Sequence, residues 1–214
     1  MSISFSGWKN VHEGKHLKSH QAAKRGGIYM MYHGTHKTHA TAIVRSGFRP
    51  STNGLLGPGV YVSRNKAKAM CYPLTASDDD RVVFKLGVRV GKVKKIDRDN
   101  HPMQMSWHQN GYDTAWVPPK SGISTIRSGR EEDCVWDPKR ITIVGVSHCQ
   151  DDQEKEELKR LIKKQARASS GRRSPGRSCR VCRKQMKGTH TVLDCWQCGK
   201  SICPFLDQHR CRRN

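Results

Sequence analysis

The stretch MMYHGTHKTHATAIVRSGFRPSTNGLLGPGVYVSRNKAKAMCYP spans residues 30–73 and carries the main structural signals of the chain. The apolar run GGIYMMYHG, which begins at residue 26 and overlaps the start of this stretch, is typical of a buried strand that ends near His33. Further along, a Gly-Pro-Gly turn precedes Val-Tyr-Val and presents Tyr61. Taken singly, a histidine after a strand or a glycine-rich turn is more often structural than functional.

Two short helices are expected around these signals. Residues 38–48 predict the first helix, whose candidate core contacts are Ala42, Ile43 and Phe48. Residues 63–72 predict the second helix, capped at its start by the Ser63 hydroxyl and ended before Pro73.

Alternating apolar residues farther along the chain predict additional strands. Residues 81–97 alternate valine, phenylalanine and leucine with polar positions, which is strand periodicity. Residues 133–148 predict a strand pair broken by Pro138. The intervening residues 100–132 are rich in turn formers and aromatics, and long loops of this kind are often functional. Strands together with short helices predict an α+β fold class.

Composition narrows the class of partner. The 214 residues carry a formal net charge of +22, and 35% of them are hydrophobic. This balance favours polyanionic partners such as nucleic acid, although a solvated basic surface fits the charge equally well. No apolar run approaches the roughly 20 residues of a membrane helix, and the start lacks a secretory signal, so we expect no membrane partner. We expect a cytoplasmic location, with a nuclear one as the alternative.

The residues after 150 differ from the preceding ones in composition and charge pattern. Residues 151–168 begin with acids and end with bases, as a helix prefers, and carry a thin apolar stripe of Leu158, Leu161 and Ile162. A Gly-, Ser-, Pro- and Arg-rich linker follows. The predicted organisation is an N-terminal extension (1–24), a domain with the apolar patterning (25–150), a basic helix with a flexible linker (151–178) and a cysteine/histidine-rich module (179–214).

The last 36 residues predict a small zinc module. Two CxxC pairs lie twelve residues apart, and each pair can offer two thiolates to one tetrahedral ion. The eight candidate ligands are Cys179, Cys182, His190, Cys195, Cys198, Cys203, His209 and Cys211. They suffice for two zinc ions, and a single ion held by the CxxC pairs is the alternative. The basic residues among them are compatible with RNA or DNA contact and equally with a protein partner.

The order of three landmarks resembles a known family. His33 lies in YHGT, Tyr61 in GPGVYV with Tyr72 eleven residues later, and Glu132 precedes DCVWDP. This order is similar to the catalytic domain of the diphtheria-toxin-like ADP-ribosyltransferases, the poly(ADP-ribose) polymerase family. The resemblance covers roughly residues 25–150 and implies an α+β fold with a split, mostly antiparallel sheet and short helices. LGPGVYVSR, GYDTAWVPP and EEDCVWDPKRI further resemble its compact virus- and interferon-induced members from fish, which implies an antiviral setting.

The resemblance implies an enzyme that uses NAD as its substrate, and the residue chemistry agrees. Tyr61 and Tyr72 can stack on both sides of nicotinamide, while the backbone of Gly34 can approach its carboxamide. His33 and Thr35 can bond ribose hydroxyls, and the Glu132 carboxylate can stabilise the positive charge that develops on the ribose. The implied catalytic residues are His33, Tyr61 and Glu132. The implied NAD-binding residues are His33, Gly34, Thr35, Tyr61, Ser63 and Tyr72.

One position departs from the family pattern. Where a serine commonly bonds the nicotinamide amide, three residues before the second tyrosine, this chain has Ala69, and Ser63 is a candidate substitute. The expected reaction is transfer of ADP-ribose to a protein or nucleic-acid acceptor, with mono- favoured over poly-ADP-ribosylation. The alternatives are a catalytically weak NAD- or RNA-binding factor and an RNA 2′-phosphotransferase-like enzyme.

Overall fold

The computed structural model describes residues 3–4, 17–18, 20–23, 27–126, 128–169, 193–194, 201–202 and 208–209. The chain divides into two compact units, of which one is Gly14–Ile162 and the other combines Met1–Glu13 with Lys163–Asn214. In the second unit, two short strand pairs are described: β1 (Ile3–Ser4) with β11 (Gln208–His209), and β9 (Leu193–Asp194) with β10 (Ser201–Ile202). No helix in the described part of the chain is long and apolar enough to cross a bilayer.

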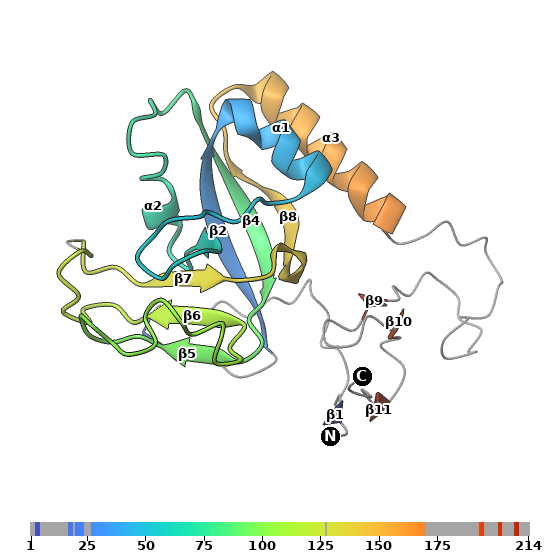
Figure 1. Ribbon diagram of the computed structural model, residues 1–214. Coiled ribbons are helices and arrows are strands. Elements are labelled where there is room, and N and C mark those ends of the chain that lie inside the picture. Colours follow the sequence, from blue (N-terminus) through green and yellow to red (C-terminus); the bar gives the residue numbers. More distant parts are fainter. Residues whose placement is uncertain are drawn as a thin grey trace. The chain divides into compact units, whose positions relative to one another are not determined.

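The Gly14–Ile162 unit is built around a three-stranded antiparallel sheet (Figure 1). Its order is β2 (Ile28–His36), β4 (Arg81–Arg89) and β8 (Ile141–His148). All three strands confirm the strands expected from the apolar patterning. The central strand β4 buries its alternating side chains completely; these are Val82, Phe84, Leu86 and Val88.

A second sheet of four strands carries the other half of this unit. Its order is β3 (Val60–Val62), β7 (Glu132–Val135), β6 (Thr114–Val117) and β5 (Val93–Lys95), and only the β5–β6 pair is parallel. Figure 1 shows its strands running in a clearly different direction from those of the first sheet. A β-bridge between Tyr32 and Ser63 joins the two sheets, which confirms a split, mostly antiparallel arrangement.

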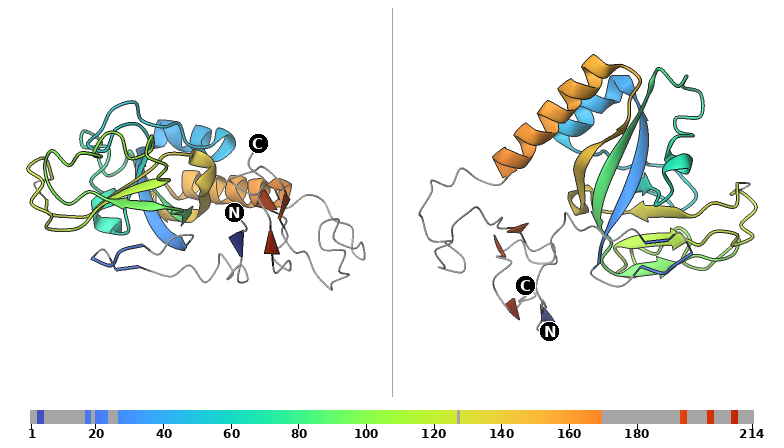
Figure 2. Two further views of the ribbon diagram at one scale, coloured as in Figure 1. Left: turned by 60° about the horizontal axis from the view of Figure 1, so that its bottom comes forward. Right: turned by 180° about the vertical axis from the view of Figure 1, so that it is seen from behind.

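The helices α1 (Lys37–Ser46) and α3 (Asp152–Ser169) lie alongside each other in Figures 1 and 2. The α3 stripe expected from the sequence is confirmed, because its apolar side chains join the core of the first sheet. In α1 the expectation for Ala42 is wrong, since that residue is exposed. Ala40 and Val44 face the core instead, one helical turn apart and in line with the buried Phe48.

The remaining helix, α2 (Lys66–Ala69), is a single turn and is shorter than the helix expected over residues 63–72. Its cap is Asn65, whose side-chain oxygen accepts hydrogen bonds from the amides of Ala67 and Lys68. The predicted cap at Ser63 is wrong, because that residue forms the bridge between the sheets and its hydroxyl donates elsewhere. The expected break at Pro138 is confirmed as a 3-10 turn, η2 (Pro138–Arg140), between β7 and β8.

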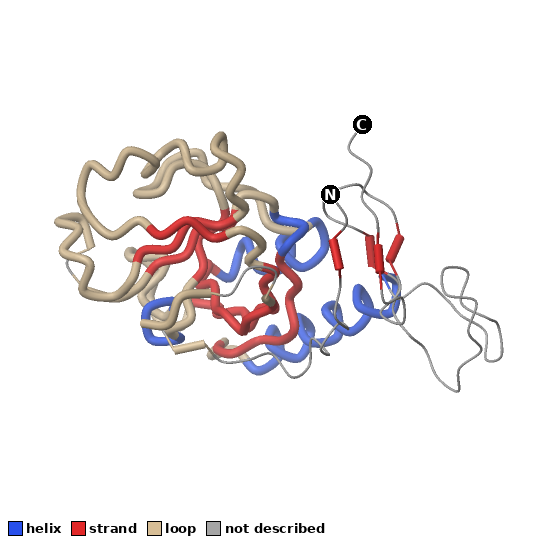
Figure 3. The backbone as a smooth tube through the Cα atoms, turned by 90° about the horizontal axis from the view of Figure 1, so that it is seen from below, coloured by secondary structure: helices blue, strands red, loops and turns tan. Residues whose placement is uncertain are grey.

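Long connections surround the four-stranded sheet, as the tan segments of Figure 3 show. They are not all surface loop. Strand β6 lies inside the turn-rich segment 100–132, where no strand was expected, and Trp107 and Trp116 are buried there. Together with Leu56, Ile96 and Cys134, Trp107 forms a second core that fixes this sheet.

Candidate active site

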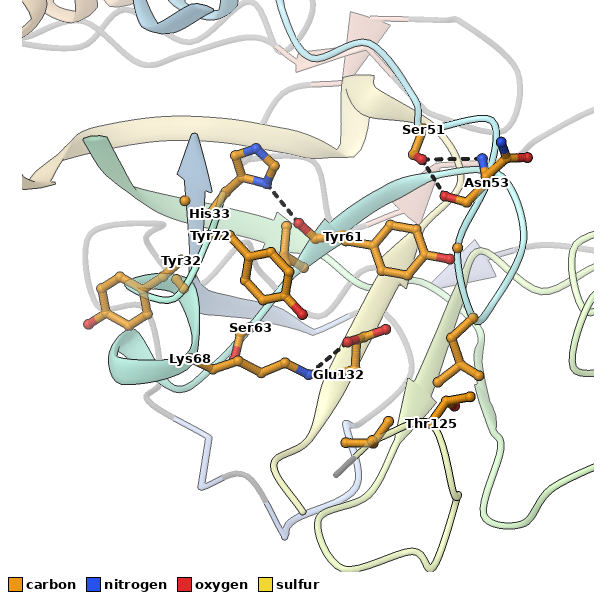
Figure 4. A pocket seen from close by; sticks show the side chains of 16 residues that line it. Tyr32, His33, Ser51, Asn53, Tyr61, Ser63, Lys68, Tyr72, Thr125 and Glu132 are labelled. Carbon is orange, nitrogen blue, oxygen red and sulfur yellow. Dashed lines mark hydrogen bonds and ion pairs between the residues drawn. The ribbon is translucent and has the colours of Figure 1, made fainter. Parts of the chain in front are cut away.

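A cleft of about 460 Å³ opens where the two sheets meet. Strand β2, strand β3, helix α2 and the first residue of β7 all contribute to its wall (Figure 4). The wall is completed by Ser51, residues 53–55, Tyr72 and residues 125–126. Its lining residues include six of the seven NAD-site residues expected from the sequence: His33, Gly34, Tyr61, Ser63, Tyr72 and Glu132.

The ring of Tyr61 is held in place at its hydroxyl end. The Tyr61 hydroxyl donates to the carbonyl oxygen of Gly57 over 2.7 Å and accepts from the amide of Leu56 over 2.9 Å. Burial raises the pKa of Tyr61 well above its ordinary value, so the phenol stays protonated. With its hydroxyl bonded to the chain, Tyr61 offers its ring rather than its oxygen to a ligand.

Tyr72 supplies a second aromatic ring on the same cleft. In Figure 4 the rings of Tyr61 and Tyr72 both border the cavity, and the Glu132 carboxylate lies near the gap between them. Tyr72 is 41% exposed, which is high for a large aromatic side chain. Burial of part of the ring, and then the negative charge of Glu132, raise the pKa of Tyr72. A flat ligand between these rings would therefore stack beside a carboxylate.

The Glu132 carboxylate is paired with Lys68. The Nζ atom of Lys68 lies 2.7 Å from Oε2 of Glu132, and a second hydrogen bond of 2.8 Å joins Nζ to the carbonyl oxygen of Glu131. Only 8% of the Lys68 side chain and 13% of the Glu132 side chain are exposed. Such a pair fixes the orientation of the carboxylate because both bonds are charge-assisted and shielded from water.

The imidazole of His33 is oriented by the strand that carries Tyr61. Its Nδ1 lies 2.8 Å from the carbonyl oxygen of Tyr61, which can only accept, so Nδ1 carries the proton. Burial lowers the pKa of His33, while the bond to the carbonyl acts in the opposite direction. The neutral ring leaves Nε2 as an acceptor, and the edge of the ring packs against Phe48 with centroids 5.0 Å apart.

A second hollow of about 430 Å³ adjoins the cleft. His33, Ser51 and Tyr61 line both cavities, so they form the boundary between the two. Thr35, the remaining expected site residue, lines the second hollow with Phe48. A long ligand could therefore occupy both hollows and pass His33 at its middle.

Gly34 is required by close packing at the cleft wall. A Cβ atom at this position would lie 2.0 Å from the carbonyl oxygen of Ala69 and 2.6 Å from that of Tyr72. The absence of a side chain thus brings β2 against the segment that carries Tyr72. Ala69 itself is 3% exposed and lines the cleft, so no side-chain hydroxyl stands at that point of the wall.

The comparison with known families agrees with this geometry. The family described as the poly(ADP-ribose) polymerase catalytic domain matches residues 9–164, which is more than half of the chain. The chain belongs to this family. The resemblance inferred from His33, Tyr61 and Glu132 is thereby confirmed at the family level, and it supports an ADP-ribosyltransferase. A search of curated proteins gives no significant match, and the likeness to the fish members stays a prediction.

Two residues at this candidate site were not predicted from the sequence. Lys68 adjoins Ala69 on α2, but a lysine in a basic chain is indistinguishable from a solvated one until its partner is known. Glu131 is only 1% exposed and accepts a hydrogen bond of 2.7 Å from Ser63, whereas a glutamate beside another acid is usually solvated. The Ser63 hydroxyl therefore lines the cleft with its proton already donated.

The structure leaves the expected zinc module untested. Of its eight candidate ligands, His209 falls in β11 and the other seven lie outside the described residues, so the zinc hypothesis stays a prediction. Among the described residues, no group of three or more His, Cys, Asp or Glu side chains is arranged to hold a metal ion.

Proposed function

We propose that this domain transfers a single ADP-ribose unit from NAD to a protein or nucleic-acid acceptor. The observation that carries the proposal is the Glu132 carboxylate, oriented by Lys68 and bordered by the rings of Tyr61 and Tyr72 in one cleft. A carboxylate beside an aromatic slot suits a substrate whose leaving group is a flat cationic ring. Membership of the poly(ADP-ribose) polymerase family supports NAD as that substrate.

NAD would occupy both hollows. Nicotinamide would stack between Tyr61 and Tyr72, and its ribose would then lie beside Glu132. The adenosine half would extend into the second hollow, where Thr35 supplies a hydroxyl. Nε2 of neutral His33, at the boundary between the hollows, would accept a hydrogen bond from a ribose hydroxyl.

The reaction replaces one bond at the anomeric carbon of the ribose. The glycosidic bond to nicotinamide breaks, and its electron pair neutralises the pyridinium ring as nicotinamide leaves. Positive charge develops on the ribose, where Glu132 stabilises it and binds the 2′-hydroxyl. The acceptor then forms a bond to the same carbon through an oxygen, nitrogen or sulfur atom and releases its proton to solvent.

The net charge of +22 supports an acidic acceptor, such as nucleic acid or an acidic protein surface. The likeness of three sequence stretches to virus-induced fish proteins supports an antiviral role in the cytoplasm or nucleus. Ala69 supports a second candidate function, in which the domain binds NAD but turns it over slowly. A wall without a hydroxyl offers the nicotinamide amide one contact fewer.

The test uses the full chain, NAD labelled in the adenosine half, and RNA, DNA or protein acceptors. Transfer should label an acceptor in the wild type and in the control Glu157→Gln, an exposed position on α3. His33→Ala and Glu132→Gln should lose label, the latter by about 100-fold or more, because an oriented charge at the reacting centre is removed. NAD binding without label under all acceptor conditions would favour the second candidate and overturn the first.

A further inference from the structure

Glu131 precedes β7, the strand that carries Glu132, and connects it to the turn before α2. Its Oε1 atom accepts hydrogen bonds from the Ser63 hydroxyl at 2.7 Å, from the Arg64 amide at 2.8 Å and from the Asn65 amide at 3.3 Å. The residue is 1% exposed, so water does not compete for these donors. One carboxylate oxygen therefore gathers three consecutive residues of the turn that leads to Lys68.

The backbone of the same residue holds the other end of that segment. The carbonyl oxygen of Glu131 accepts a hydrogen bond of 2.8 Å from Nζ of Lys68, the atom that also contacts Glu132. A helix of one turn, such as α2, has too few internal hydrogen bonds to keep its own geometry. The position of Lys68 therefore depends on what holds the segment from outside.

A second buried carboxyl group makes the charge of Glu131 tolerable. Asp133, the second residue of β7, supplies this group two residues after Glu131. Asp133 lies 3.2 Å from the guanidinium of Arg64, and both side chains are buried. Burial, and then the charge of Glu131, raise the pKa of Asp133 well above its ordinary value. A proton retained by Asp133 can be donated to Glu131.

A proton shared by Glu131 and Asp133 would account for two otherwise isolated atoms. Oε2 of Glu131 and Oδ2 of Asp133 are buried, and neither receives a hydrogen bond from an N–H or hydroxyl group of the described residues. Two ionised carboxylates could not satisfy each other, whereas a carboxyl and a carboxylate can. With one proton shared, the two carboxyl groups would carry one negative charge, which the guanidinium of Arg64 would balance.

From these contacts we infer that Glu131 is a positioning residue that places Lys68 against Glu132. The inference rests on the proposed function, since it concerns the same transfer reaction. Glu131 immediately precedes β7 and does not line the cleft. Replacing Glu131 would change the rate of transfer by displacing Lys68, and it would leave the proposed NAD-binding rings of Tyr61 and Tyr72 in place.

The experiment compares Glu131→Ala with Glu131→Gln and with Lys68→Met in the full chain. Glu131→Ala should lower kcat about tenfold or more, because a small displacement of a positioned group is costly, with an NAD dissociation constant within about threefold of wild type. Glu131→Gln should restore most of the rate, since its amide oxygen can accept from the turn and its NH₂ can donate to Asp133. Adding Glu131→Ala to Lys68→Met should cause little further loss, because both act through one contact.

Multiplicative losses in the double variant would overturn the inference, and so would a wild-type kcat in Glu131→Ala. If Glu131→Ala does not fold, Ser63→Ala removes one of the three donors and takes its place. It should lower kcat by about threefold, with no additional loss in the Lys68→Met background. A wild type that binds NAD without transferring label would instead overturn the proposed function, and with it the reaction that this positioning serves.

Discussion

The Nζ atom of Lys68 lies 2.7 Å from Oε2 of Glu132, where both side chains are largely shielded from water. A carboxylate held at one oxygen can present its other oxygen to a substrate in a fixed direction. This contact joins α2 to β7 and so couples the wall of the cleft that carries Tyr72 to the proposed catalytic group.

Replacing this lysine tests whether the contact matters for rate. Lys68→Met keeps the length of the side chain and removes its charge, which leaves Glu132 without its orienting partner. We expect kcat for ADP-ribose transfer to fall by about 100-fold, as for other single preorganised contacts at a reacting centre. Lys66→Met, at an exposed position of the same helix, is the matched control and should keep the wild-type rate. Equal rates in both variants would show that Glu132 needs no help from Lys68.

Gly34→Ala tests the close approach of β2 to the Ala69–Tyr72 segment. The added Cβ would lie 2.0 Å from a backbone oxygen, so one of the two segments must move. We expect the NAD dissociation constant to rise about tenfold or more, together with a lower thermal midpoint, since overpacking typically costs about 1–3 kcal/mol. Gly145→Ala in β8 is the control, because a Cβ there meets no atom within 4 Å. Normal NAD binding by Gly34→Ala would contradict a tight wall at this point.

Ala69→Ser tests whether the missing hydroxyl limits NAD binding. A hydroxyl on the cleft wall can hydrogen-bond the nicotinamide amide, and a neutral hydrogen bond contributes about 0.5–1.5 kcal/mol. We expect the KM for NAD to fall by about two- to tenfold, as measured in initial-rate assays. Ala67→Ser, exposed on the same helix, should leave KM unchanged. An unchanged or higher KM in Ala69→Ser would place nicotinamide away from α2.

Local patterns were sufficient to predict much of this fold. The alternation in β4 identified a strand because both its spacing and its β-branched residues agree. Strand β6 was missed since its four residues stand among turn formers, and only pairing with β5 and β7 makes them a strand. The phase of α1 was also misjudged at Ala42, because the face that is buried depends on where the sheet lies.

The residues of the candidate site also differ in whether the sequence alone could predict them. His33, Tyr61 and Glu132 could be expected at one site from their order along the chain, and the structure brings them to one cleft, while their catalytic roles stay predictions. Lys68 and Glu131 could not, because their roles arise from contacts across 64 and 68 residues of sequence. A lysine or glutamate is normally solvated, and only burial beside a partner distinguishes these two.

The pH dependence of stability tests the buried state of His33. Burial lowers its pKa below the ordinary value of 6.5. Between the folded pKa and 6.5 the unfolded chain therefore binds a proton that the folded chain does not, so stability is full above 6.5 and is lost as pH falls through the folded pKa. We expect the thermal midpoint of the wild type to drop more between about pH 7.5 and pH 5.5 than that of His33→Gln.

The variant chosen for this comparison keeps a donor for the carbonyl oxygen of Tyr61, because the glutamine amide can replace Nδ1–H. His20→Gln, at an exposed position, controls for the loss of one histidine. The slope of thermal midpoint against pH, measured by calorimetry in the absence of NAD, should be shallower only in His33→Gln. Equal slopes in the wild type and His33→Gln would mean that the imidazole of His33 can be protonated in the folded domain without a loss of stability. Nε2 would then be a donor, and the proposed hydrogen bond from a ribose hydroxyl would have to run in the opposite direction.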